Sequence, residues 1–276
     1  MNRINQVFKK SKDILSIYFT SGFPKLDDTI EIIKQLDSSK VQMIEIGLPF
    51  SDPLADGPTI QKSSEIALKN GMTTDLLFKQ LNGLRTITDI PVVIMGYFNP
   101  ILQYGFEKFC RKCKNVGIDG LIVPDLPVEI YQKDYNKITE KFGLNMMFLI
   151  TPQTSNERIY KIDKFSNGFI YMVSSYSVTG ARNSFDEYQI DYFNRIKKMK
   201  LSNPLLIGFG IGNNNTYKTA CKYSSGAIIG SAFIKHIKRN GVKSTKDFIS
   251  EITEWLSCKN WWVDINSFWL VKRITS

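Results

Sequence analysis

Short apolar runs recur along this chain, each bounded by turn-forming residues. They are rich in Ile, Val, Phe and Tyr, which favours strands. Eight strands are expected, at residues 14–20, 41–48, 91–98, 120–126, 145–151, 168–175, 204–210 and 226–232. Most of these runs are almost continuously apolar rather than alternating, as expected for parallel strands buried on both faces.

Segments with apolar residues at helical spacing lie between these runs. The clearest are residues 26–39, 63–70, 74–87, 105–117 and 155–166. Strands that alternate with helices predict a parallel α/β fold, and eight of them predict a closed (β/α)8 barrel, the TIM barrel. An open doubly wound sheet is the alternative, but "YFTSGFP" follows the first strand where that fold usually carries GxGxxG.

The division of the chain is predicted to be simple. No Ser- or Gly-rich linker interrupts it, so residues 1–276 are expected to form a single barrel domain. A Trp-rich tail at about 258–276 follows the last expected helix. Trp261, Trp262 and Trp269 in this tail could pack on the barrel exterior or form an interface.

Composition excludes some classes of protein. Hydrophobic content is 43% and charged content 22%, which is ordinary for a globular chain. The sequence contains no run of about 18 apolar residues that could span a membrane. The N-terminus does not resemble a signal peptide, so a cytoplasmic location is expected. The net charge is +10, but the lysines are scattered along predicted helices. Without a basic stripe this charge is weak evidence for nucleic acid, and no nucleic-acid partner is predicted.

The cysteines and the single histidine offer little chemistry. Cys110 and Cys113 form a CxxC on one face of a predicted helix, which favours packed thiols. His236 lies in a helical pattern and is expected to be structural. Because no set of ligands converges at a recognisable spacing, no metal site is predicted.

Glu45 stands out because it lies inside an apolar strand. In a barrel, residues near the carboxyl ends of strands form the active site. A buried carboxyl tends to have a raised pKa, which suits general acid–base catalysis. The structural alternative is a Glu held by backbone N–H groups or by a Lys. In the following loop, Asp56 precedes Gly57 and Pro58 and is favoured as functional, whereas Asp52 is favoured as a turn residue.

Glycine-rich loops follow the last two expected strands. "GFGIG" contains Gly208, Gly210 and Gly212, and "IIGSAFI" places Gly230 and Ser231 before a helix. Glycine lets backbone N–H groups approach an anion, and barrels often bind phosphate at this place. Tight turns alone are the structural alternative for any one of these glycines. The polar segment 175–189, with Thr179 and Gly180, is long enough to be a lid loop.

The motifs together resemble the tryptophan synthase alpha chain family. The likeness covers about residues 1–257 and includes "IEIGLPFSDPLADGPTIQ", "MGYFNPILQYG", "GLIVPDLPVE", "YMVSSYSVTG" and "AIIGSAFIK". The resemblance implies a (β/α)8 barrel that acts as a carbon–carbon lyase. The implied reaction cleaves indole-3-glycerol phosphate into indole and glyceraldehyde 3-phosphate. It also implies a beta-chain partner in an α2β2 assembly. Pyridoxal phosphate is expected in that partner, which receives the indole through a tunnel, and no cofactor is expected in this chain.

Residue roles carry over by matched motif. Glu45 and Asp56 match the catalytic acids of the family, and Thr179 matches its lid residue. The phosphate contacts match Gly180, Gly210, Gly230 and Ser231. The indole pocket matches Tyr18, Ile122, Tyr171 and Ile228. One departure is Ser177, where many members have Gly, and it is expected to stiffen the lid without changing the reaction.

Several other functions remain as alternatives. Indole-glycerol-phosphate synthase usually needs a catalytic Lys on a strand, and none of the eight expected strands contains Lys. A phosphoribosyl isomerase usually needs paired Asp residues at strand ends. A non-catalytic barrel that mainly binds and activates a partner would not need Glu45 and Asp56. A basic RNA-binding protein would need an aromatic and basic platform, and the sequence shows none.

Overall fold

Eight parallel strands close into a barrel in sequence order. The computed structural model describes residues 2–39, 41–174 and 184–253. The strands are β1 (Ile14–Thr20), β2 (Met43–Gly47), β3 (Val92–Met95), β4 (Gly120–Ile122), β5 (Asn145–Ile150), β6 (Ile170–Val173), β7 (Leu205–Gly208) and β8 (Gly226–Ile229). Each strand pairs with the next, and β8 pairs with β1. The predicted (β/α)8 barrel and all eight strands are therefore confirmed.

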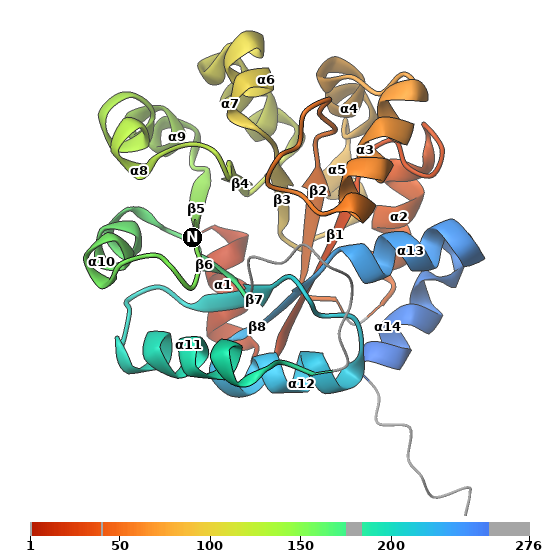
Figure 1. The fold of residues 1–276 in the computed structure, drawn as a ribbon. Helices are drawn as coiled ribbons and strands as arrows, with labels where there is room; N and C mark the ends of the chain where they lie inside the picture. Colours follow the sequence, from red (N-terminus) through yellow and green to blue (C-terminus); the bar gives the residue numbers. More distant parts are fainter. Residues whose placement is uncertain (1, 40, 175–183, 254–276) are drawn as a thin grey trace, which may run out of the picture.

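Helices surround the strands as a ring (Figure 1). They are α1 (Arg3–Lys10), α2 (Asp28–Asp37), α3 (Pro58–Lys69), α4 (Thr74–Gln80), α5 (Leu84–Ile87), α6 (Phe98–Tyr104), α7 (Phe106–Val116), α8 (Val128–Ile130), η1 (Tyr131–Tyr135), α9 (Asn136–Phe142), α10 (Asn156–Phe165), α11 (Glu187–Lys198), α12 (Asn214–Tyr223), α13 (Ser231–Asn240), η2 (Val242–Ser244) and α14 (Thr245–Thr253). The helix expected at residues 74–87 is divided into α4 and α5, because Gly83 adopts a left-handed conformation with φ of +80°.

Several expected strands end earlier in the structure. The run 91–98 is a strand only to Met95, and Tyr97 is instead the N-cap residue of α6. The run 120–126 is a strand only to Ile122. The apolar residues beyond these points leave the barrel wall at its carboxyl end, where the loops form the mouth. Apolar character alone does not show where pairing with the neighbouring strands stops.

The register of β1, β2 and β3 places Glu45 in the middle of the barrel wall. Tyr18 pairs with Glu45, and Glu45 pairs with Val93 on its other side. One layer nearer the amino ends of the strands, Ser16 pairs with Met43. The strand residues at this depth are buried on both faces, as the almost continuous apolar runs predicted.

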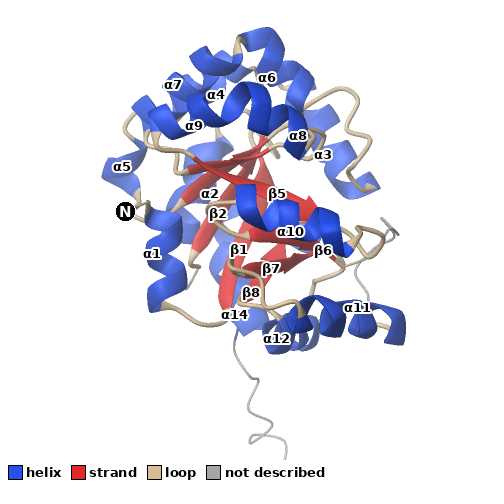
Figure 2. Ribbon diagram, turned by 90° about the vertical axis from the view of Figure 1, so that its left-hand side faces the viewer, coloured by secondary structure: helices blue, strands red, loops and turns tan. Residues whose placement is uncertain are grey.

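Helix α1 closes the end of the barrel where the strands begin (Figure 2). Ile4 is fully buried, and its side chain lies against Gly120 and Gly168. The side-chain amide of Asn2 donates to the carbonyl of Asp119, and Asn5 donates to the carbonyl of Asn167. These contacts leave the opposite, carboxyl end of the barrel as the open one.

Part of the expected lid loop is helical. Residues 187–189 of the segment 175–189 form the first turn of α11, because Asp186 and Gln189 make a reciprocal capping box. The side chain of Asp186 accepts from the backbone N–H of Gln189, and the side chain of Gln189 accepts from that of Asp186. Ser177, Thr179, Gly180 and the tail 258–276 lie outside the described residues.

Candidate active site

A cavity of about 300 Å³ lies at the carboxyl ends of the strands. Seven of the residues predicted from sequence line it: Tyr18, Asp56, Tyr171, Gly210, Ile228, Gly230 and Ser231. They come from β1, the β2–α3 loop, β6, the β7–α12 loop, β8 and the start of α13. Residues far apart in the sequence therefore meet at one site, because each lies on a parallel strand of the barrel or in the segment that follows one.

Ile122 is the predicted pocket residue that does not line this cavity. It is the last residue of β4 and is fully buried. Its paired neighbour on β3, Met95, lines the cavity.

Glu45 lies just below the cavity, with no exposed surface. The hydroxyl of Ser16 donates a hydrogen bond of 2.9 Å to its Oε1 atom, and among the described residues Oε2 has no partner. Burial raises the pKa of this carboxyl to about 8, and the Ser16 hydrogen bond opposes that rise. At neutral pH the group is therefore mostly protonated and can give a proton. Within the described residues, neither a backbone N–H group nor a Lys holds it, as the structural alternative requires.

Asp56 lies on the cavity wall beside Tyr97. The Tyr97 hydroxyl donates to Oδ2 of Asp56 at 3.1 Å, and the same hydroxyl accepts from the backbone N–H of Ala55 at 3.0 Å. Burial raises the pKa of Asp56 to about 6, and the Tyr97 hydrogen bond opposes this effect. Asp56 is therefore mostly ionised at neutral pH, whereas Glu45 is mostly protonated. Two carboxyls whose environments separate their pKa values can take different chemical roles.

Two buried tyrosines form the floor around these acids. A Cβ on Gly47 would lie 2.1 Å from the Tyr18 hydroxyl, and one on Gly208 would lie 2.3 Å from the Tyr171 hydroxyl. Each ring therefore lies over a glycine of the adjacent strand, where no other residue fits. Burial raises the pKa of both phenols well above the ordinary value, so they stay neutral. Gly208, which the sequence suggested as part of an anion loop, serves this packing.

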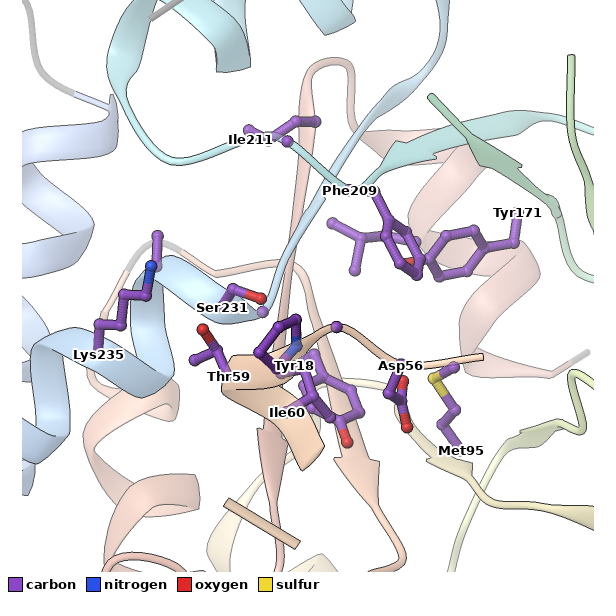
Figure 3. Close-up of a pocket in the computed structure, with 16 residues that line it drawn as sticks. Tyr18, Asp56, Thr59, Ile60, Met95, Tyr171, Phe209, Ile211, Ser231 and Lys235 are labelled. Carbon is purple, nitrogen blue, oxygen red and sulfur yellow. The ribbon is translucent and has the colours of Figure 1, made fainter. Parts of the chain in front are cut away.

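The other side of the cavity is suited to an anion. Gly230 precedes α13 and has no side chain to cap it, so the first N–H groups of the helix are left for other acceptors. Ser231 and Lys235 lie one helical turn apart and both line the cavity. Figure 3 shows this pair on the opposite side of the pocket from Asp56, Met95 and Tyr171. In contrast, the Gly212 N–H donates to Thr216 within the cap of α12.

Part of the cavity lining is apolar. It includes Ile60, Phe209, Ile211 and Ile228. The Phe209 and Tyr171 rings meet edge to face, with centroids 6.2 Å apart. A flat aromatic group with an anionic tail matches this distribution of apolar and polar surface.

Sequence reasoning missed several residues of the site. Tyr97 had been assigned to a strand, and Lys235 had been counted among the scattered surface lysines. Phe209 lies in the expected strand 204–210 and in the glycine-rich stretch, and neither pattern marks it as a residue of the site. For Lys235 a signal was present, because its spacing of four residues from Ser231 places both on one helix face. No sequence signal pairs Tyr97 with Asp56, since that contact depends on the fold of two loops.

Among the described residues, neither a cysteine nor the histidine lines the cavity. Cys110 and Cys113 are fully buried on α7, so the prediction of packed thiols is confirmed. His236 contacts the carbonyl of Ser244 at 3.1 Å and packs against the Phe248 ring. Within the described ranges, no three His, Cys, Asp or Glu side chains gather as metal ligands.

The fold and cavity define a (β/α)8-barrel enzyme with one carboxyl, Asp56, in the wall of the cavity and a second, Glu45, buried in the barrel behind it. The family model for the tryptophan synthase alpha chain matches residues 4–260. The alpha chain of Flavobacterium psychrophilum is 63% identical over 252 residues, which cover 91% of this chain and 100% of that relative. The chain therefore belongs to the tryptophan synthase alpha chain family, lyases of tryptophan biosynthesis.

Solved structures agree with this assignment. A tryptophan synthase structure from Mycobacterium tuberculosis superposes with a TM-score of 0.82 at 29% identity, covering 91% of this chain and 96% of that one. A tryptophan synthase complex from Pyrococcus furiosus gives a TM-score of 0.79 at 34% identity, covering 87% and 98%.

Proposed function

We propose that this chain cleaves indole-3-glycerol phosphate into indole and glyceraldehyde 3-phosphate. The observation that carries the proposal is the arrangement around the cavity: the ionised Asp56 lines one side, the protonated Glu45 is buried behind Tyr18 and Tyr171, and the uncapped start of α13 lies on the other side. The apolar residues of the lining suit the indole ring. Family membership supports the same reaction.

Glu45 acts as the acid and then as the base. Its carboxyl gives a proton to C3 of the indole ring, which produces a positively charged indoleninium. The bond between C3 and the glycerol side chain then breaks, and its electron pair returns to the ring and restores neutral indole. The hydroxyl on the departing carbon loses its proton to the Glu45 carboxylate as the aldehyde forms, which restores the acid.

Asp56 stabilises the charge that develops during this cleavage. As a carboxylate it accepts a hydrogen bond from the indole N–H, which becomes more acidic when C3 is protonated. The stabilisation is therefore greatest in the transition state. Tyr97 fixes the orientation of Asp56 through its hydroxyl.

The phosphate is assigned to the loops after β7 and β8. Gly210 has a φ of +71°, a conformation that glycine adopts without strain, Gly230 is the N-cap residue of α13, and Ser231 is the first residue of that helix. Gly180 is assigned here from the family motif, and Thr179 is assigned to a lid. Lys235 adds a positive charge beside this helix end.

The partner assigned to this chain is a tryptophan synthase beta chain, in an α2β2 assembly. Pyridoxal phosphate belongs to that partner, and this chain is proposed to need no cofactor. One barrel domain over residues 1–276 and a cytoplasmic location belong to the same proposal. No helix in the described part of the chain has the length and apolar character needed to cross a membrane.

The test is release of glyceraldehyde 3-phosphate from indole-3-glycerol phosphate, with and without a cognate beta chain. Slow release is expected from the chain alone, and faster release with the partner. Glu45→Gln is expected to lower turnover at least about 100-fold, since general acid–base groups contribute that much or more. A folded protein with no release under either condition would leave a binding or activating role instead.

A further inference from the structure

Ser16 is a residue of the barrel interior that no motif singles out. It lies on β1, two residues before Tyr18, and its side chain has no exposed surface. Its hydroxyl donates to Oε1 of Glu45 at 2.9 Å. A buried hydroxyl that bonds to the proposed catalytic acid can control where that acid points.

The direction of this bond decides the position of the carboxyl. Glu45 pairs with Tyr18, whereas Ser16 pairs with Met43, one layer nearer the amino ends of the strands. The Glu45 carboxyl therefore reaches back toward the interior of the barrel, away from the mouth. In agreement, Tyr18 and Tyr171 line the cavity and Glu45 does not.

We propose that Ser16 is a positioning residue that holds Glu45 withdrawn from the cavity in the ligand-free chain, and that cleavage requires this hydrogen bond to break. The inference rests on the proposed function of Glu45 as the proton donor. The second carboxyl oxygen has no partner among the described residues, so the Ser16 bond is the one polar contact shown for the withdrawn carboxyl. A single hydrogen bond is weak enough to be exchanged when substrate enters.

Among the described groups around Glu45, the Ser16 hydroxyl is the main one that can change the position and pKa of its carboxyl. Tyr18 from β1 and Tyr171 from β6 are the titratable groups whose charge interacts with Glu45, and both remain neutral because burial raises their pKa. Asp56 interacts with the same two phenols from the loop after β2. On β3, the paired residue Val93 is apolar.

The test compares Ser16→Ala with wild type in pH profiles of kcat/KM and kcat. The first quantity reports groups in the free enzyme, and the second reports groups in the substrate complex. Because the hydrogen bond opposes the raised pKa, its removal is expected to move the alkaline limb of kcat/KM upward by about half a unit. The alkaline limb of kcat stays in place, since Glu45 has already left Ser16 in the complex.

The same variant is expected to raise kcat/KM at neutral pH about threefold, because substrate no longer has to break the Ser16 bond. Ser16→Cys keeps a weaker donor of similar size and is expected to give an intermediate effect. Thr139→Val is the matched control. It removes a buried hydroxyl on α9 that makes a hydrogen bond of 2.7 Å with the Tyr131 hydroxyl. Thr139 is far from Glu45 in the sequence. This control should lower stability and leave both profiles unchanged.

Two results would overturn the inference. One is an alkaline limb of kcat/KM that stays in place in Ser16→Ala, and the other is an equal shift of both limbs, which would mean that the bond persists in the complex. Infrared spectroscopy of the ligand-free chain separates this question from the proposed function. The Glu45 carboxyl band, assigned by its loss in Glu45→Gln, must move in Ser16→Ala even if the wild-type chain releases no product. A band that does not move would also refute the inference.

Discussion

The two ends of this barrel each bury a carboxyl, and the two carboxyls differ in how many hydrogen-bond and ion-pair partners they have. At the closed end, the carboxylate of Asp119 forms ion pairs with Arg85 at 2.6 Å and with Arg3 at 3.1 Å between nitrogen and oxygen. It also accepts a hydrogen bond of 2.9 Å from the backbone N–H of Val92. At the open end, Glu45 has one hydrogen bond from Ser16 and one oxygen without a partner among the described residues. Asp119 is therefore fully paired with donors, whereas Glu45 is sparsely paired and burial favours its neutral form.

This contrast separates stability from chemistry. Arg85 also donates to the carbonyls of Gly117 and Ile90, so its guanidinium ties together the loops before β3 and β4. Among the described residues no such network surrounds Glu45, which has the Ser16 hydroxyl, apolar residues and neutral phenols as neighbours. The ion pairs and hydrogen bonds at the closed end stabilise the fold. They can offset the free-energy cost of burying the sparsely paired Glu45.

The largest expected effect concerns the pH dependence of stability. The pKa of Glu45 is about 8 in the folded chain against an ordinary value of 4.5. Folding therefore favours the protonated acid, and this stabilisation is complete below about pH 4.5 and lost as the pH rises through about 8. We expect the free energy of unfolding of wild type, relative to Glu45→Gln, to fall by on the order of 4 kcal/mol over that range.

Denaturant unfolding of both proteins at several pH values measures this difference. The other carboxyls titrate in both proteins and so cancel in the comparison. A constant difference between wild type and Glu45→Gln from pH 4.5 to 8 would show that Glu45 is ionised in the folded chain.

At the closed end, Asp119→Ala is expected to lower the free energy of unfolding by about 3 kcal/mol, because it leaves the partly buried Arg85 and the buried N–H of Val92 without their carboxylate. Arg3→Ala removes the more exposed partner and should cost about 1 kcal/mol or less. Both variants should keep the wild-type KM and kcat at a temperature where they are folded. A specific loss of turnover in either one would mean that the two ends are not independent.

Tyr97→Phe tests the support of Asp56 at the mouth. Without the hydroxyl, the pKa of Asp56 is expected to rise, because that hydrogen bond favours the ionised form. Turnover should fall about tenfold and the acid limb of the rate profile should move to higher pH. Tyr104→Phe is the control, since it removes a similar bond to Asp75 on the surface. Equal effects in the two variants would argue against the assignment.

The smallest expected effect is that of Lys235→Gln. Loss of its charge beside α13 should raise KM about threefold at low salt with little change in kcat, because an exposed charge contributes modestly. The effect should fade at high salt. Lys238→Gln, on the same helix but outside the cavity lining, is the matched variant, and a similar rise in its KM would indicate a general effect of net charge.

The sequence was sufficient for the barrel and for part of the site. The strands were predictable because apolar runs mark them. Glu45 could be predicted as a site residue because an acid inside an apolar strand is costly and is therefore expected to have a function. Asp56, Gly230 and Ser231 followed from their places after strands. Ser16 and Tyr97 were not predictable, since their roles depend on strand register and on a contact between two loops. Ile122 shows the same limit, because its position on a strand does not tell whether it reaches the cavity.

The most direct test of the account is the pH profile of kcat/KM for cleavage of indole-3-glycerol phosphate by the chain with a cognate beta chain. The account predicts a bell with an acid limb near pH 6 from Asp56 and an alkaline limb near pH 8 from Glu45. Glu45→Gln should abolish the activity that shows this profile. Activity that stays constant well above pH 8, or persists in Glu45→Gln, would contradict the claim that a protonated Glu45 gives the proton.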